Sequence, residues 1–232
     1  MKAVILAAGK GERLGSLTEQ IPKPMIEISG RPVLEHNIVM CRKNGIKDIL
    51  INLHHLPQII KTYFGDGEDW GVNISYSFEP QLLGTAGTVN KLYDDLSGMP
   101  FYVIYGDNYF GSDFNLLDLR RFHEKNMSEF TIVLSHLEDI SQSGVAEVTD
   151  NGRITGFVEK PIDVENNDSW INAGMYLVEP IILNEIAGGY SDFGNDVIPL
   201  LIKSNRNVYG YKMNNDVLPI DTPELLAKHV ID

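Results

Sequence analysis

The stretch KAVILAAGKGERLGSLTEQIPKPM, residues 2–25, decides the fold of this chain. It begins with an apolar run, Ala3–Ala7, which predicts a buried β-strand. The strand breaks into a turn that holds two glycines and Arg13, and further on Lys23 stands between two prolines. Small residues let backbone N–H groups come close to a ligand, and the two cations can neutralise phosphates. This arrangement indicates nucleotide chemistry.

Two better-known nucleotide motifs do not fit this stretch. The dinucleotide fingerprint places its third glycine at position 14, where Leu14 stands, and Gly15 comes one place late. The string of a P-loop, G-x-x-x-x-G-K-[S/T], is absent from the sequence. On these residues alone, an ordinary strand and loop with two incidental cations stays open as an alternative.

The composition sets limits on partners and location. With 232 residues, of which 43% are hydrophobic, the chain can bury the core of one large domain. The net charge of −13 argues against nucleic acid or an anionic membrane as a partner. No apolar run approaches the roughly 18 residues of a membrane span, and no signal-peptide layout is present. A single cysteine, Cys41, excludes an intrachain disulfide framework, so we expect a cytoplasmic protein.

Strand-like and helix-like segments alternate over the first part of the chain. After the first strand, strands are predicted at 48–53, 73–78, 100–105 and 130–137, and helices at 32–43, 55–64, 87–96 and 114–125. Repeated alternation of this kind predicts an α/β fold that is Rossmann-like, with a mixed, mostly parallel sheet flanked by helices.

The second half predicts a small C-terminal α+β subregion. Short strands are expected at 144–149, 153–159, 173–178 and 208–212, with a helix at 195–204. Asn151-Gly152 marks the tip of a hairpin between the first two of these strands. The polar, acidic stretch 163–169 reads as a loop, and whether it closes over a ligand stays open.

Two aspartates follow apolar stretches at positions that suit a metal ion. Asp107 comes directly after the predicted strand 100–105, and ligands of open α/β sheets bind at the carboxyl ends of strands. Asp221 ends a second apolar stretch in the same way. Carboxylates are hard oxygen ligands for Mg²⁺, so the two can hold metal together. The plainer alternatives are a turn-capping and a helix-capping aspartate.

Two further segments carry candidate ligand contacts. In the segment 83–87, LGTAG, small residues permit close approach of a flat base, and Thr85 can read its edge; the plainer reading is a tight strand–helix turn. Glu159 and Lys160 end a strand side by side. Strand neighbours point to opposite faces, so a simple ion pair is not expected, although twisting at a strand end brings both toward one ligand. A solvated edge strand is the alternative.

Two more segments lie towards the C-terminus. Asn172 stands before two small residues at the start of a strand, and its amide can both donate to and accept from hydroxyl groups. The segment 193–199, FGNDVIP, reads equally as a plain helix N-terminus or as a ligand-side segment.

Together and in this order, the motifs resemble those of the sugar nucleotidyltransferase family, the sugar-1-phosphate nucleotidylyltransferases. The resemblance runs from residue 2 to about residue 225. It rests on LAAGKGER (6–13), PKP (22–24), LGTAG (83–87), GD (106–107), EKP (159–161), NAG (172–174) and DTP (221–223). The ordered set is specific for the family and much less specific for the substrate.

The resemblance implies an enzyme that joins a nucleoside triphosphate to a sugar 1-phosphate, giving an NDP-sugar and pyrophosphate. It assigns the nucleotide, the reaction centre and the Mg²⁺ cofactor as follows: base and ribose to Leu6, Ala7, Ala8 and Gly9; triphosphate to Gly11 and Arg13; the reacting phosphate to Lys23; base to Gly84 and Thr85; Mg²⁺ to Asp107 and Asp221. The resemblance also implies that Glu159 and Asn172 bind the sugar hydroxyls and that Lys160 binds the sugar phosphate. Arg13, Lys23 and Asp107 are the expected catalytic residues.

The resemblance also implies one catalytic domain over residues 1–232, with residues 1–110 mainly nucleotide-binding and residues 111–232 mainly sugar-binding. Two departures stand out: an alanine pair, Ala7 and Ala8, replaces a common glycine pair, and no glycine separates Asp221 from the following threonine. The oligomeric state, a homo-oligomer included, is left open by the sequence.

The substrate is the least determined part. LGTAG preceded by Glu79-Pro80 looks most like the mannose-1-phosphate guanylyltransferase branch, which implies GTP with mannose or manno-heptose 1-phosphate. Uridylyl, thymidylyl and cytidylyl transfer to another sugar or non-sugar phosphate are alternatives. An alternative of another class is a non-catalytic sensor that binds an NDP-sugar.

Overall fold

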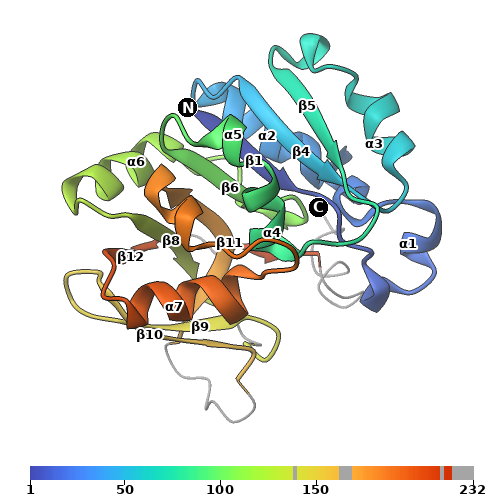
Figure 1. Cartoon of the computed structure of the whole chain (residues 1–232). Helices are drawn as coiled ribbons and strands as arrows, with labels where there is room; N and C mark the ends of the chain where they lie inside the picture. The colour runs from blue at the N-terminus through green and yellow to red at the C-terminus, as the bar shows by residue number, and fades with distance from the viewer. Residues whose placement is uncertain (138–139, 162–168, 215–216, 221–232) are drawn as a thin grey trace. The chain divides into compact units, whose positions relative to one another are not determined.

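The computed structural model describes residues 1–137, 140–161, 169–214 and 217–220. It divides into two compact units, each made of separate segments of the chain. Figure 1 colours the chain by residue number, from blue at the N-terminus to red at the C-terminus. Of the described residues, the first unit comprises Met1–Leu82, Ile104–Asn115 and residues 218–220, and the second comprises those within Leu83–Val103 and Leu116–Val217.

Three parallel strands form the centre of the first unit: β1 (Lys2–Leu6), β4 (Asp48–Leu53) and β5 (Asn73–Phe78). Along the chain they are connected through α2 (Val33–Lys43) and α3 (Pro57–Phe64). The hydroxyl of Tyr63 on α3 donates to the carboxylate of Glu35 on α2 over 2.8 Å, so the two helices lie side by side (Figure 1). The apolar middle of β1 is fully buried, as expected for a parallel strand covered by helices.

The first unit also contains short elements that hydrophobic periodicity does not predict. They are η1 (Glu12–Leu14), α1 (Leu17–Gln20), η2 (Lys23–Met25), β2 (Glu27–Ile28), β3 (Arg31–Pro32), η3 (Glu68–Trp70), β7 (Asn108–Tyr109) and β13 (Leu218–Pro219). Elements of two to four residues are too short to show a period. They matter here because β7 and β13 pair antiparallel, with Asn108 opposite Pro219.

The second unit is mainly antiparallel. Its strands are β8 (Phe130–Ser135), β9 (Gly144–Val148), β10 (Ile154–Glu159), β11 (Trp170–Val178) and β12 (Val208–Lys212). β11 runs antiparallel to β8 and β9, β9 and β10 form a hairpin, and β12 runs parallel to β8. Gly152 at the hairpin tip has φ +85° and donates to the Thr149 carbonyl, which confirms the predicted Asn151-Gly152 turn.

Helices cover these strands. They are α4 (Gly84–Lys91), α5 (Tyr93–Leu96), α6 (Leu116–Lys125) and α7 (Ile198–Lys203), with a 3-10 helix, η4 (Pro180–Glu185), and a π-helical turn, η5 (Phe193–Val197). In Figure 1, α6 lies against β8 and β12, and α7 lies against β10. β6 (Phe101–Tyr105) leads from this unit into the first.

The predicted fold class is confirmed: a mixed, mostly parallel α/β fold flanked by helices, with parallel order in the first unit and an antiparallel region in the second. The predicted strands at 48–53, 73–78 and 208–212 agree residue for residue. The helix predicted at 87–96 is instead two helices, of which α4 begins at Gly84 because the carbonyl of Ser191 accepts the N–H groups of Ala86 and Gly87.

Several predictions lie outside the described residues. They concern most of the 163–169 loop and Asp221, with its metal-binding and helix-capping alternatives. Within the described part of the chain, no helix has the length and apolar character that crossing a membrane requires.

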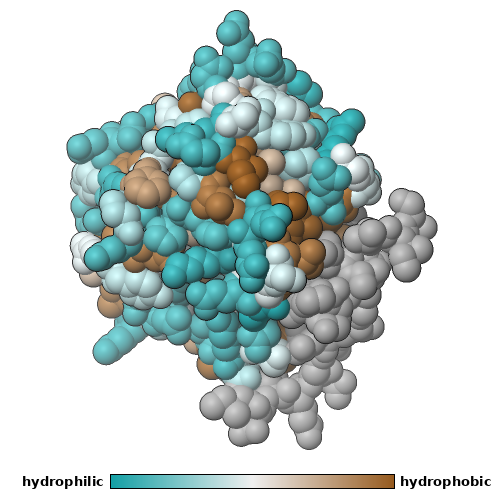
Figure 2. Space-filling view, turned by 90° about the vertical axis from the view of Figure 1, so that its right-hand side faces the viewer, coloured by the Kyte–Doolittle hydropathy of each residue, from teal (hydrophilic) through white to brown (hydrophobic). Residues whose placement is uncertain are grey.

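The side of Figure 1 on which α1 and α3 are labelled faces the viewer in Figure 2. This face is mostly hydrophilic, with small groups of apolar side chains. Exposed apolar residues of the first unit include Leu17, Ile21, Ile59, Tyr63 and Phe78. Scattered exposed apolar side chains are ordinary on folded proteins, so they point to no particular partner.

Candidate active site

The turn after β1 is held in place from its first residue. The Ala7 N–H donates to the Asn52 side-chain oxygen over 2.7 Å, and the Gly106 N–H donates to the Leu6 carbonyl over 2.8 Å. Ala7 and Ala8 are buried, whereas Gly9 is exposed, and a Cβ added at Gly9 would meet no atom within 4 Å. The turn predicted to contact base and ribose therefore leaves the sheet at a fixed point and opens to solvent at Gly9.

Backbone conformation and packing explain the glycine at position 11, in the next part of the turn. Gly11 has φ +68°, and a Cβ there would come within 2.7 Å of the Thr18 methyl group. The Thr18 hydroxyl also donates to the Gly11 carbonyl over 2.9 Å. Arg13 is exposed on η1, and its neighbour Leu14 is buried in a small apolar cluster with Ile28, Val33 and Ile220. Leu14 thus anchors the 3-10 helix that carries Arg13.

Lys23 and Asp107 come together although they were predicted for different roles. The Lys23 ammonium group donates to the Asp107 carboxylate, and the two form an ion pair. Lys23 is only 6% exposed, between two buried prolines. A buried ammonium group needs a carboxylate or comparable acceptors nearby, because burying an unneutralised charge is costly.

The backbone around Asp107 leads to the last described residues. The Ile220 N–H donates to the Asp107 carbonyl over 3.1 Å, which continues the β7–β13 pairing by one residue. Asp221, the other predicted metal ligand, follows Ile220 in the sequence and lies outside the described residues.

The donor chemistry at Asp107 fits Mg²⁺. The described ranges contain no group of three or more His, Cys, Asp or Glu side chains arranged around a metal position. Mg²⁺ is commonly held by one or two carboxylates together with substrate phosphates and water, so a full protein cage is not required. The carboxylate of Asp107 is a hard oxygen donor that already faces a cation.

In the second unit, the small residues of LGTAG are explained by a neighbouring segment. Gly84 has φ +74°, and a Cβ there would lie 2.3 Å from the Ser191 carbonyl oxygen. A Cβ at Gly87 would lie 2.3 Å from the Gly189 carbonyl oxygen. Backbone packing therefore requires glycine at both positions, whether or not a base also approaches Gly84.

The hydroxyl of Thr85 is engaged within the protein. It donates to the Asp192 carboxylate over 2.8 Å and accepts the Phe193 N–H over 2.9 Å. The same carboxylate caps η5 by accepting the Gly194 and Asn195 N–H groups. Asp192 was missed by the sequence reasoning, although an aspartate just before a predicted helix is a typical N-cap signal. The base contact of Thr85 stays a prediction.

Glu159, at the end of β10, lies in a tight backbone setting. A Cβ added at Gly144 or Gly194 would come within 2.6 or 2.2 Å of a Glu159 carboxylate oxygen. Burial raises the pKa of Glu159, the nearby Asp192 carboxylate raises it further, and Lys160 opposes both effects. The segment 192–194 therefore contacts both Thr85 and Glu159.

Lys160 breaks the alternation of its strand. It follows the last residue of β10 with φ +47°, a left-handed conformation that side chains other than glycine rarely adopt. Because the backbone turns at Lys160, the side chains of Glu159 and Lys160 do not have to point to opposite faces as neighbours within a strand do. Strained residues of this kind are concentrated at functional sites.

Asn172 closes a bulge in β11. Its side-chain oxygen accepts the Gly174 N–H over 2.9 Å, and its amide donates to the Tyr176 hydroxyl over 2.6 Å. The pairing of β11 with β8 shifts register between Asn172 and Tyr176, and Gly174 has φ +75°. The asparagine thus has a structural role in the described protein, and its contact with a sugar stays a prediction.

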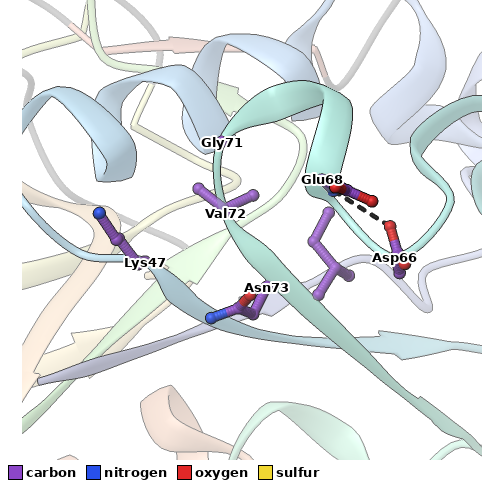
Figure 3. Close-up of a pocket in the computed structure, with 7 residues that line it drawn as sticks. Lys47, Asp66, Glu68, Gly71, Val72 and Asn73 are labelled. Atoms are coloured by element: carbon purple, nitrogen blue, oxygen red, sulfur yellow. Dashed lines mark hydrogen bonds between the residues drawn. The ribbon is translucent and has the colours of Figure 1, made fainter.

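An open pocket of about 600 Å³ lies elsewhere in the first unit, at the amino ends of β4 and β5 (Figure 3). Its lining includes Lys47, Asp66, Glu68 and Asn73, and the dashed line in Figure 3 is the bond from the Glu68 N–H to the Asp66 carboxylate. None of the predicted site residues lines it. The turn after β1 lies instead at the carboxyl ends of the parallel strands.

Comparisons with known proteins agree with this picture. A family model described as nucleotidyl transferase matches residues 2–217. The chain is 36% identical over 228 residues to a UTP–glucose-1-phosphate uridylyltransferase of Synechocystis sp., covering 92% of this chain and 58% of that protein. It is 32% identical over 229 residues to a mannose-1-phosphate guanyltransferase of Yarrowia lipolytica, covering 97% of this chain and 61% of that protein. The chain thus spans about three fifths of the length of these relatives.

A solved structure shows the same fold. The crystal structure of HddC from Yersinia pseudotuberculosis complexed with GMP-PN has a TM-score of 0.80 and 25% sequence identity, and the match covers 99% of this chain and 97% of that chain. Fold and motifs define an α/β protein of the nucleotide-diphospho-sugar transferase fold. The chain belongs to the nucleotidyl transferase family and, by its relatives, to the sugar nucleotidyltransferases.

Proposed function

We propose that this protein transfers a nucleotidyl group from a nucleoside triphosphate to a sugar 1-phosphate with the help of Mg²⁺, giving an NDP-sugar and pyrophosphate. The observation that carries the proposal is the pairing of Lys23 with Asp107 in the same unit as the turn after β1. A protein with a net charge of −13 has to concentrate positive charge where it handles phosphates, and Lys23 is a buried cation in a family motif.

The proposed chemistry is an in-line displacement. An oxygen of the sugar phosphate forms a bond to the α-phosphorus, the bond from that phosphorus to the bridging oxygen breaks, and pyrophosphate leaves with the electron pair. No covalent enzyme intermediate is needed, so catalysis consists of positioning and charge neutralisation. Mg²⁺ held by Asp107 and Asp221 would supply a Lewis acid that neutralises phosphate oxygens.

The residues of each unit then have distinct tasks. In the first unit, Gly11 and Arg13 bind the triphosphate, and Lys23 holds the phosphate at the reaction centre. In the second unit, Gly84 and Thr85 contact the base, and Glu159, Lys160 and Asn172 bind the sugar phosphate. The functional halves, 1–110 and 111–232, and a cytoplasmic location remain part of the proposal.

For the substrate pair, we favour GTP with mannose or manno-heptose 1-phosphate. Relatives named mannose-1-phosphate guanyltransferase, and the HddC structure with GMP-PN, support this choice. The uridylyltransferase relative keeps UTP with glucose 1-phosphate as the main alternative. Thymidylyl and cytidylyl transfer remain further alternatives.

The test is pyrophosphate release with Mg²⁺ over a matrix of GTP, UTP, dTTP, CTP and ATP against several sugar 1-phosphates. The expected result is one strong nucleotide–sugar pair in the wild type and loss of turnover in Asp107→Asn, with nucleotide binding partly retained. A UTP or dTTP signal would correct the base and keep the chemistry. Nucleotide binding without release from any pair would favour the NDP-sugar sensor.

A further inference from the structure

We propose that Asn52 is a positioning residue for the nucleotide-binding turn, and that Glu79 holds the side-chain amide of Asn52 in the orientation that the turn needs. This inference rests on the proposed function, because it concerns the turn from Ala7 to Gly9. Asn52 is the last residue of β4 that pairs with β1, opposite Leu6, and Glu79 directly follows β5. All of these residues belong to the first unit.

A buried chain of hydrogen bonds connects the three residues. The Ala7 N–H donates to Oδ1 of Asn52 over 2.7 Å, and Nδ2 of Asn52 donates to Oε1 of Glu79 over 2.9 Å. Asn52 is 4% exposed and Glu79 is 1% exposed. Hydrogen bonds in a buried setting of this kind fix geometry strongly, because a partner lost there is not replaced by water.

The two hydrogen bonds of Asn52 can run in only one direction. The main chain of Glu79 is fixed, because its N–H donates to the Leu53 carbonyl over 2.8 Å and its carbonyl lies 2.7 Å from Nδ1 of His54. The Ala7 N–H can only donate, so Asn52 has to present its oxygen to the turn and its NH₂ group to Glu79. The carboxyl oxygen of Glu79 accepts from that NH₂ group and so holds the Asn52 amide in this orientation.

The bond to Ala7 falls where it matters for the turn. Leu6 is the last residue of β1 in the ladder with β4, so the chain leaves the sheet at Ala7. A side-chain oxygen accepts the Ala7 N–H at that point and keeps it satisfied while the backbone changes direction. The start of the turn is thus fixed before any ligand binds, which is the usual way to lower the ordering cost of binding.

The decisive variants exchange donor and acceptor. Asn52→Asp keeps an acceptor for Ala7 but sets two carboxylates against each other at Glu79. Glu79→Gln alone keeps an oxygen that accepts from Asn52. The double variant Asn52→Asp/Glu79→Gln restores both hydrogen bonds. Only the bond between residues 52 and 79 reverses its direction, because the glutamine NH₂ donates to the new carboxylate. Asn52→Asp is therefore expected to be impaired and the double variant to be rescued.

A matched control lies on the same two strands. Asn73 of β5, labelled in Figure 3, donates through Nδ2 to the Asp48 carboxylate of β4 over 2.9 Å, at the amino ends of the strands. Asn73→Asp also sets two carboxylates against each other, in an exposed setting. It does so four residue pairs from the turn, about 13 Å along the strands.

The first measurement is hydrogen exchange of the backbone amides at residues 7–9 without ligand. Exchange is expected to quicken in Asn52→Asp, to return towards the wild-type rate in the double variant, and to be unchanged in Asn73→Asp. Unchanged exchange in Asn52→Asp would overturn the proposal. This readout needs no nucleotide, so it decides the positioning role even if the proposed function fails.

The second measurement is the split between the two KM values. In Asn52→Asp, the KM of the nucleoside triphosphate is expected to rise about tenfold or more, and that of the sugar phosphate to stay within about twofold. The double variant is expected to recover most of the loss. Equal rises in both KM values, or no rescue, would assign Asn52 a general structural role and overturn the proposal. Wild-type protein without nucleotide binding or turnover would instead overturn the proposed function.

Discussion

The ammonium group of Lys23 and the carboxylate of Asp107 form an ion pair across 84 residues of sequence. The side chain of Lys23 is 8% exposed and that of Asp107 is 24% exposed. A residue predicted to bind phosphate and a residue predicted to bind metal thus neutralise each other in the free protein. Substrate and metal binding would have to exchange this contact for new ones.

A double-mutant cycle on this pair should show strong coupling. Lys23→Met and Asp107→Asn are each expected to lower the free energy of unfolding by about 2 kcal/mol, because each leaves a partly buried charge without its partner. The double variant should lose less than the sum of the two. Urea unfolding measures all four proteins. The exposed pair of Arg121 with Asp118 is the control, and Arg121→Met should cost no more than about 0.5 kcal/mol. Additive losses would refute the coupling.

Substitutions of Gly9 and Gly11 in the turn after β1 should affect nucleotide binding and stability differently. Gly9→Ala should leave the melting temperature unchanged, because its Cβ meets open space, yet raise the KM of the nucleotide if a ligand approaches there. Gly11→Ala should lower the free energy of unfolding by about 1–3 kcal/mol, because of the positive φ and the 2.7 Å approach to Thr18. Thermal melts and nucleotide titrations of both variants check this. Unchanged nucleotide binding in Gly9→Ala would remove Gly9 from the predicted site.

Lys160 is expected to show opposite effects on stability and binding. Lys160→Gly should raise the free energy of unfolding by about 0.5–1 kcal/mol, because glycine adopts φ +47° without strain. It should also raise the KM of the sugar phosphate about tenfold through loss of one charge contact. Lys160→Ala is the control, because it should raise the KM of the sugar phosphate as Lys160→Gly does but should not raise the free energy of unfolding. A KM change for the nucleotide alone would contradict the assignment.

Glu159 should give the sugar site a pH dependence. Burial and Asp192 raise its pKa above the ordinary value of 4.5. The carboxylate form of Glu159, which is proposed to accept from sugar hydroxyls, is then lost at a higher pH than usual. As the pH falls from 7 towards 5, the KM of the sugar phosphate should rise more steeply in the wild type than in Glu159→Gln. Both proteins share the titration of the sugar phosphate itself, so the difference between them belongs to Glu159.

The same shift has a consequence for stability. The pKa of Glu159 is higher in the folded protein than its ordinary value of 4.5. As the pH rises from 4.5 through the pKa of the folded protein, the carboxyl group loses its proton and the folded protein becomes less stable. Glu159→Gln is therefore expected to raise the melting temperature at pH 7 and to change it little at pH 4. Scanning calorimetry at the two pH values measures this. A lower melting temperature at pH 7 would show that the carboxylate is stabilising instead.

The elements of this fold could be predicted where periodicity is strong. The strand β4 is a buried apolar run and β5 alternates apolar and polar residues, and the limits of both agree with the predictions. The start of α4 could not be found in the same way, because the carbonyl of Ser191, more than a hundred residues away, determines it. Contacts of this kind leave no local pattern in the sequence.

In the candidate site, too, the sequence predicted single residues, whereas their contacts with distant residues are seen only in the structure. The motifs located Lys23 and Asp107 separately, but only the structure shows that they pair. The small residues of LGTAG suggested room for a base, whereas the backbone at Ser191 already requires Gly84. Asn52 carries no motif signal, since its partner Ala7 is distant in the sequence. The N-cap role of Asp192 has a local signal, but its bond to Thr85 does not.

The pairing of β7 with β13 constrains how the chain is made. Asn108 meets Pro219 only after the whole second unit has been synthesised, which takes roughly ten seconds at about 5–20 residues per second. The backbone carbonyl of Asp107 likewise waits for Ile220. A chain that ends before residue 218, after a stall in synthesis or a proteolytic cut, lacks β13, so β7 beside Asp107 loses the strand that pairs with it.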